Sequence, residues 1–137
     1  MYTVNTKKVI AMAFIAIAIS SAYTFARQND DKAILKAREA VQNASPDDWH
    51  TLAKSAEKCL NKKANLKEAN EWIEKSIEIK PTVYNLGLKG DYYMLNQLPE
   101  KALEYYVKAM TTAKSENVES DVSDIQRKIA QITNIGG

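Results

Sequence analysis

Apolar residues recur every three or four positions through most of this chain, with polar and charged residues between them. That spacing puts the apolar side chains on one face of a helix, whereas a strand would alternate with a period of two. No run of alternating β-branched residues occurs, and the only glycines are Gly87, Gly90, Gly136 and Gly137. The pattern therefore predicts an all-α chain.

Helix breakers divide the pattern into a series of predicted helices. Proline suits the first turn of a helix and disfavours helical geometry in the residue before it, and the prolines are Pro46, Pro81 and Pro99. Asp30 or Asp31 is a suitable cap for the first helix, because a carboxylate accepts hydrogen bonds from free backbone N–H groups. The predicted helices span residues 30–44, 47–60, 66–79, 83–95, 99–114 and 119–132.

Two of these helices are related by a shift of 33 residues. Segment 66–81 aligns on segment 99–114 and superposes three pairs: Ala69 with Ala102, Ile73 with Tyr106, and Ser76 with Ala109. A shift of this size is the length of one helix–turn–helix repeat. The helices before them match only at a shift of 37, which pairs Trp49, Leu52, Ala53 and Ala56 with Leu86, Lys89, Gly90 and Tyr93. We therefore expect the first hairpin to have a loop four residues longer, at about 61–65.

The repeated positions alternate in size, which suits closely packed helices. Small residues let helix axes approach each other, and they are Ala53, Ala69, Gly90, Ala102 and Ala109. Large residues would fill the space beside them, and they are Trp49, Leu52, Ile73, Leu86, Tyr93 and Tyr106. On this spacing Tyr93 and Tyr106 point into the core, which leaves Tyr84, Tyr92 and Tyr105 for the surface or a groove.

These residues resemble the tetratricopeptide repeat family, whose pattern is W-x₂-L-G-x₂-Y, then A-x₃-F, then P. The second unit supplies Leu86, Gly90, Tyr93, Ala102 and Tyr106, with Lys89 in place of leucine and Lys114 in place of proline. The resemblance implies a short right-handed solenoid of about six helices over residues 30–134. Its parts would be a first repeat at about 47–81, a second at about 83–116, and a capping helix at 119–132. The chain also resembles small exported bacterial proteins that carry such helical pairs.

The resemblance further implies a concave groove lined by the first helix of each pair. The groove face would carry Asp47, His50, Lys54 and Glu57 from one unit, and Tyr84, Asp91 and Met94 from the next. The mixed charges do not form the basic clamp with which some members of the family bind carboxylate tails. The chemical class of the ligand therefore stays open.

The N-terminus is unlike the rest of the chain. Lys7 and Lys8 precede an unbroken apolar run over residues 9–19, and small and polar residues follow as far as Ala26. This is the order of regions in a secretory signal peptide. We expect cleavage of residues 1–26, with cleavage after Ala22 as the alternative. The other interpretation is a retained anchor, but a span needs an apolar run of about 20 residues, so no stable membrane span is expected after cleavage.

Charge and chemistry narrow the function. Removing residues 1–26 lowers Lys plus Arg from 19 to 17, which equals Asp plus Glu and leaves no basic field for nucleic acid. His50 is the only histidine, and neither a metal-ligand cluster nor a nucleophile motif is present, so no cofactor, metal or catalysis is expected. The single Cys59 lies on an apolar stripe and is expected in the core, with a reactive thiol or an intermolecular bridge as the alternatives.

Together these features predict an exported, non-enzymatic repeat protein, periplasmic or secreted, that binds another protein or peptide. The alternative is a structural helical protein of the envelope that associates with itself and has no peptide-binding groove. A homo-oligomer would then form through the unmatched faces of the first and last helices.

Overall fold

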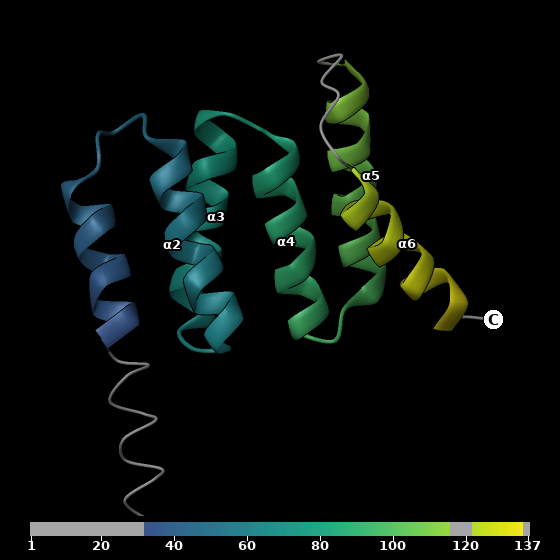
Figure 1. The fold of residues 1–137 in the computed structure, drawn as a ribbon, viewed down its shortest axis with the longest axis horizontal. Coiled ribbons are helices and arrows are strands. Elements are labelled where there is room, and N and C mark those ends of the chain that lie inside the picture. Colours follow the sequence, from purple (N-terminus) through teal and green to yellow (C-terminus); the bar gives the residue numbers. More distant parts are fainter. Residues whose placement is uncertain (1–31, 116–121, 136–137) are drawn as a thin grey trace, which may run out of the picture. The chain divides into compact units, whose positions relative to one another are not determined.

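The computed structural model describes residues 32–115 and 122–135, and the chain divides into two compact units, residues 1–33 and 34–137. All regular structure in the described residues is helical, as the apolar spacing predicts (Figure 1). No helix in this part of the chain is both long enough and apolar enough to span a bilayer. The predicted signal peptide, residues 1–26, lies outside the described residues.

The helices closely follow the predicted ones. Residues 32–43 are helical, and five further helices follow: α2 (Trp49–Lys62), α3 (Leu66–Ile79), α4 (Val83–Leu95), α5 (Pro99–Ser115) and α6 (Ser123–Ile135). From α2 to α5 the helices run alternately up and down (Figure 1). The last helix begins four residues later than the predicted start at 119, and residues 119–121 lie outside the described residues.

Side-chain caps fix where α2 and α4 begin. The carboxylate of Asp48 accepts a hydrogen bond of 2.9 Å from the backbone N–H of Thr51, so α2 begins at Trp49 and not at the predicted Asp47. Thr82 and Asn85 form a capping box on α4, in which each side chain accepts a hydrogen bond from the other residue's backbone N–H. A cap of this kind is worth about 1 kcal/mol.

The prediction of a longer loop in the first hairpin is wrong. Helix α2 continues to Lys62, so the loop spans only residues 63–65, as short as the turn at 96–98 in the second hairpin. Left-handed backbone at Lys63 and Asn65, with φ of 50° and 52°, lets the chain reverse in so few residues. The offset of 33 residues therefore holds for the loops as well as for α3 and α5.

Two apolar clusters form the core of the second unit. One joins the helix at 34–43 to α2 and α3, with Leu88 of α4, and its fully buried members include Ala53, Ala56, Cys59, Ala69 and Ile73. The other joins α4, α5 and α6 through Leu86, Ala102, Tyr106, Ala109 and Ile125. Ile77 packs against both clusters, so apolar packing continues from one hairpin to the next.

Gly90 allows α4 and α5 to approach closely. A Cβ atom at Gly90 would lie 2.2 Å from Cε1 of Tyr106, far inside the ordinary carbon–carbon contact distance of about 3.5–4.0 Å. The ring of Tyr106 is 1% exposed and occupies the space that a side chain at position 90 would need. The small–large pairing expected of these two positions is therefore present in the packing.

Buried polar groups join the first hairpin to the second. Ser76 of α3 donates a hydrogen bond of 2.8 Å to the backbone carbonyl of Trp49, and Nδ2 of Asn85 donates to Oγ of Ser76 at 2.9 Å and to the carbonyl of Lys80 at 2.8 Å. Lys89, whose side chain is 2% exposed, reaches across from α4 to pair with Glu74 of α3 at 2.7 Å. These contacts fix how α4 sits against α3.

Candidate partner groove

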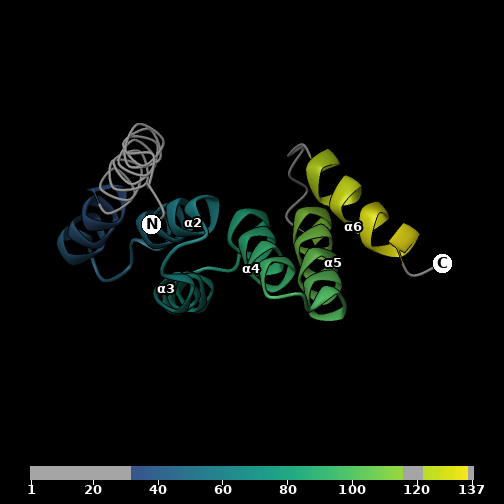
Figure 2. The ribbon, with the colours of Figure 1, turned by 90° about the horizontal axis from the view of Figure 1, so that it is seen from below.

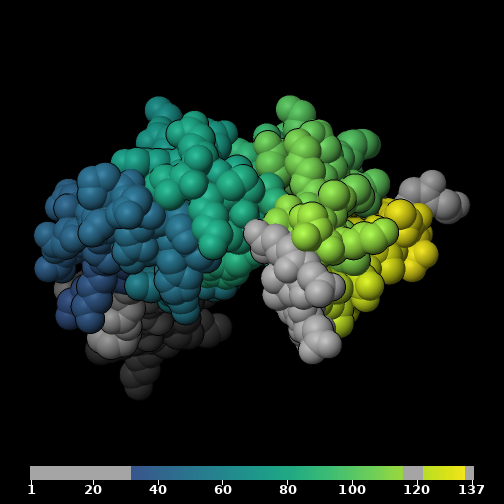
Figure 3. Space-filling model, turned by 90° about the horizontal axis from the view of Figure 1, so that it is seen from above, coloured from purple at the N-terminus to yellow at the C-terminus, as the bar shows by residue number. Residues whose placement is uncertain are grey.

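Helices α2, α4 and α6 line two adjoining cavities in the second unit. The smaller cavity has a volume of about 340 Å³ and the larger about 470 Å³, and they share Glu57, Leu88, Asp91 and Lys128. In Figure 2, α4 follows α2, and α6 lies beyond α5 at the other end of the row of helices. In the space-filling view the blue and teal atoms of the earlier helices lie on one side, and the green and yellow atoms of α5 and α6 lie on the other (Figure 3). We call the two cavities together the α2–α4–α6 groove.

The structure brings some of the predicted groove residues together and separates others. Tyr84 and Asp91 line the smaller cavity, and Asp91 and Met94 line the larger one. His50 is exposed, with its ring centroid 6.1 Å from that of Tyr84. Asp47 and Lys54 are exposed and line neither cavity. Asp47 lies in the turn before α2, and Lys54 lies on α2 itself.

Tyr84 and Glu57 form the contact between α2 and α4 in the groove. The hydroxyl of Tyr84 donates a hydrogen bond of 2.8 Å to Oε2 of Glu57. Burial, together with this hydrogen bond to a carboxylate, raises the pKa of Tyr84 far above its ordinary value. The phenol therefore stays neutral and holds the carboxylate in one place.

A polar network fixes α6 against α4 and α5. The buried hydroxyl of Tyr106 donates to Asp91 at 2.7 Å, and the ammonium of Lys128 lies 2.8 Å from Asp91 and 2.9 Å from Asp124. Burial opposes the charge on Lys128, but the hydrogen bonds to Asp91 and Asp124 outweigh it and raise its pKa. Under the network, Cδ1 of Ile125 reaches to 3.0 Å from where a Cβ of Gly87 would lie.

The sequence missed the contribution of the last helix to the groove. The apolar stripe of this helix includes Ile125, but the sequence does not predict that Asp124, Ile125 and Lys128 lie beside α4, because this depends on how α6 packs back on the second hairpin. A signal was present, since Asp124 and Lys128 flank the apolar stripe of α6 at a spacing of four residues. That stripe is formed by Val122, Ile125 and Ile129.

Most predicted packing residues are buried, but two of the large ones are not. The buried ones are Leu52, Ala53, Ala69, Ile73, Leu86, Gly90, Ala102, Tyr106 and Ala109. Tyr93 is partly buried: it packs against the second cluster and lies beside Tyr105, with ring centroids 5.5 Å apart. Trp49 is also partly exposed, and it is Trp72 that is buried against the first cluster.

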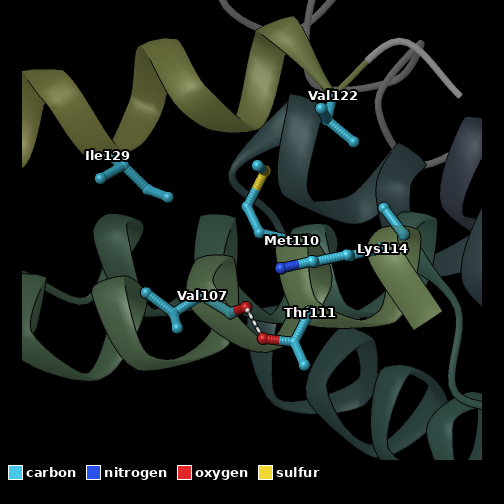
Figure 4. Close-up of a pocket in the computed structure, with 7 residues that line it drawn as sticks. Val107, Met110, Thr111, Lys114, Val122 and Ile129 are labelled. Atoms are coloured by element: carbon cyan, nitrogen blue, oxygen red, sulfur yellow. Dashed lines mark hydrogen bonds between the residues drawn. The ribbon is translucent and has the colours of Figure 1, made fainter. Parts of the chain in front are cut away.

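A third cavity lies between α5 and α6, away from the groove. It has a volume of about 500 Å³, and Figure 4 shows Val107, Met110, Thr111 and Lys114 of α5 facing Val122 and Ile129. Val107 is 49% exposed, a high value for an apolar side chain. Apolar side chains of α5 and α6 therefore line this cavity, on a side of α6 away from the groove.

Among the described residues, no three or more His, Cys, Asp and Glu side chains are grouped so as to hold a metal ion. Comparison of the chain with protein-family models, with curated proteins and with solved structures finds no match.

Proposed function

We propose that this protein is an exported, non-enzymatic helical-repeat protein of the tetratricopeptide type that binds a segment of another protein in the α2–α4–α6 groove. The observation that carries the proposal is that Glu57, Tyr84, Asp91, Met94 and Lys128, from three helices, line two adjoining cavities. Grooves with apolar floors and a few placed polar groups are typical binding sites.

Further support comes from the rigidity of the groove walls. Caps fix the starts of α2 and α4, the Tyr84–Glu57 bond joins α2 to α4, and the Asp91–Lys128–Asp124 network joins α4 to α6. A preformed surface loses less conformational entropy on binding than a flexible one. Export is supported by the order of regions at residues 1–26 and is tested by N-terminal sequencing of the mature protein.

Site-specific photocrosslinking tests the groove. A benzophenone side chain is placed at Met94 in the groove, or at Val107 on α5 as a control, since these side chains are 37% and 49% exposed. Each variant is expressed in the native host and its adducts are identified by mass. We expect a defined protein adduct from position 94 that is absent from position 107. Adducts from position 107 alone, or none from position 94, would overturn the proposal.

A second candidate function is self-association, and the apolar cavity between α5 and α6 is the observation that favours it. A second copy seated there would cover Val107 and Ile129. If the protein associates with itself in this way, photocrosslinking from position 107 should give adducts of twice the mass of the chain. Sedimentation velocity of the mature chain would then show a mass that rises with concentration.

A further inference from the structure

The smaller cavity of the groove combines an apolar floor with a charged rim. Val83, Leu88 and Ile125 supply apolar side chains, and Gly87 contributes backbone against which Ile125 packs. With a volume of about 340 Å³ the cavity has room for one long side chain of a bound segment. A side chain that entered here would bury its stem on the floor and present its head group to the rim.

The rim of this cavity carries an excess of negative charge. Glu57, Asp91 and Asp124 contribute three carboxylates, against one ammonium, that of Lys128. Lys128 is already engaged by both Asp91 and Asp124. The larger cavity has no such excess, since there Glu57 and Asp91 are balanced by Lys63 and Lys128. The excess of two negative charges is therefore confined to one end of the groove.

We propose that the smaller cavity is a subsite for a lysine or arginine side chain of the bound partner, an inference that rests on the proposed groove function. Lysine and arginine have an apolar stem and a cationic head, which match the floor and the rim in turn. The ring of Tyr84, which lines the cavity, adds a π face for the cation. An acidic side chain would meet the same excess of negative charge and be repelled.

Titration with capped amino acids tests the subsite on the full chain. The probes are the N-acetyl methylamides of lysine and arginine, with that of norleucine as the uncharged isostere of lysine and that of glutamate as the opposite charge. Binding is followed by backbone amide NMR. We expect saturable shifts with lysine and arginine at the amides of Glu57, Gly87, Leu88 and Asp124, weakened by added salt. The norleucine and glutamate probes should give no saturable shifts over the same range of concentration.

Substitutions assign the effect to the rim. Glu57→Gln and Asp124→Asn keep the side-chain shape, and each should weaken lysine binding by about two- to fivefold, the size of one partly exposed ion pair. Glu104→Gln is the control, because Glu104 is an exposed carboxylate on α5 that lines neither cavity. Equal binding of norleucine, or equal weakening by Glu104→Gln, would overturn the subsite.

The outcomes separate this inference from the function on which it rests. If position 94 crosslinks to a partner while norleucine binds as well as lysine, the groove stands and the basic subsite is wrong. If position 94 gives no adduct, the groove function is wrong whatever the probes show. Replacing the lysine or arginine residues of the crosslinked partner segment by norleucine or citrulline should weaken its binding at least tenfold.

Discussion

Gly90 and Gly87 lie on the same helix, three residues apart, and the structure predicts opposite effects when each is changed to alanine. Alanine is favoured over glycine in a helix interior by about 1 kcal/mol, and this gain applies equally at both positions. What differs is the neighbour. At Gly90 the added Cβ would meet Cε1, Cδ1 and Cζ of Tyr106 at 2.2, 2.5 and 2.8 Å, whereas at Gly87 it would meet only Cδ1 of Ile125, at 3.0 Å.

The ring of Tyr106 has little freedom to move. It is 1% exposed and its hydroxyl is bonded to Asp91, so an added methyl group must push α4 and α5 apart. Overpacking of this kind costs about 1–3 kcal/mol. We expect Gly90→Ala to lower the free energy of unfolding by up to about 2 kcal/mol after the helix gain of about 1 kcal/mol is subtracted. The Cδ1 of Ile125 ends a flexible side chain, so Gly87→Ala should be neutral or stabilising by up to about 1 kcal/mol.

Urea and thermal unfolding of the full chain, followed by circular dichroism, measures both variants. The two midpoints should differ by roughly 10 °C, since 1 kcal/mol corresponds to about 4–8 °C in a domain of this size. In a Tyr106→Leu background the penalty of Gly90→Ala should disappear, because the ring that it meets is gone. Equal midpoints for Gly90→Ala and Gly87→Ala would refute the close approach of α4 to α5.

Three further predictions test other contacts. Lys89→Leu puts the residue that the repeat pattern expects in place of a buried lysine whose partner Glu74 is half exposed, and it should change stability by less than about 1 kcal/mol. Lys89→Ala should cost about 3 kcal/mol through lost packing. A cost for leucine as large as that for alanine in urea unfolding would contradict this. Asn85→Ala removes half of the capping box and the hydrogen bond that Ser76 Oγ accepts, so it should lower the free energy of unfolding by at least about 2 kcal/mol. Asn96→Ala, at an exposed position, should lower it by under about 0.5 kcal/mol in the same assay. Burial and the hydrogen bond to Asp91 raise the pKa of Tyr106, so the unfolded chain loses the phenol proton first and the free energy of unfolding should fall as pH rises above about 10. Tyr106→Phe should flatten this decline when unfolding is measured from pH 8 to 11. An unchanged slope in that variant would count against the buried phenol.

The sequence predicted the helices well because local signals set their limits. Thr82 and Pro99 mark the starts of α4 and α5, and the apolar spacing of α3 defines its whole length. The start of α2 was wrong by two residues because Asp47 and Asp48 are equally good caps in isolation. Only the turn that Ser45 makes, through a 3.0 Å hydrogen bond from the N–H of Asp48, selects the second of them.

The candidate site was less predictable because it depends on contacts between distant segments. The spacing of Tyr84, Asp91 and Met94 put them on one face of α4, and the structure places all three in the groove. The position of Lys128 beside Asp91 joins residues 37 apart in the chain and is set by packing of Ile125 on Gly87. Lys89 was missed as a buried residue because a lone lysine reads as exposed unless its partner Glu74 is known to be near.

Hydroxyl-radical footprinting of the protein with and without its crosslinked partner tests the groove most directly. Tyrosine and methionine are readily oxidised, and the chain offers a matched pair on each face, with Tyr84 and Met94 in the groove and Tyr105 and Met110 on the side of α5. We expect the partner to protect Tyr84 and Met94 from oxidation and to leave Tyr105 and Met110 unchanged. Protection of Tyr105 and Met110, with Tyr84 and Met94 oxidised as in the free protein, would contradict it.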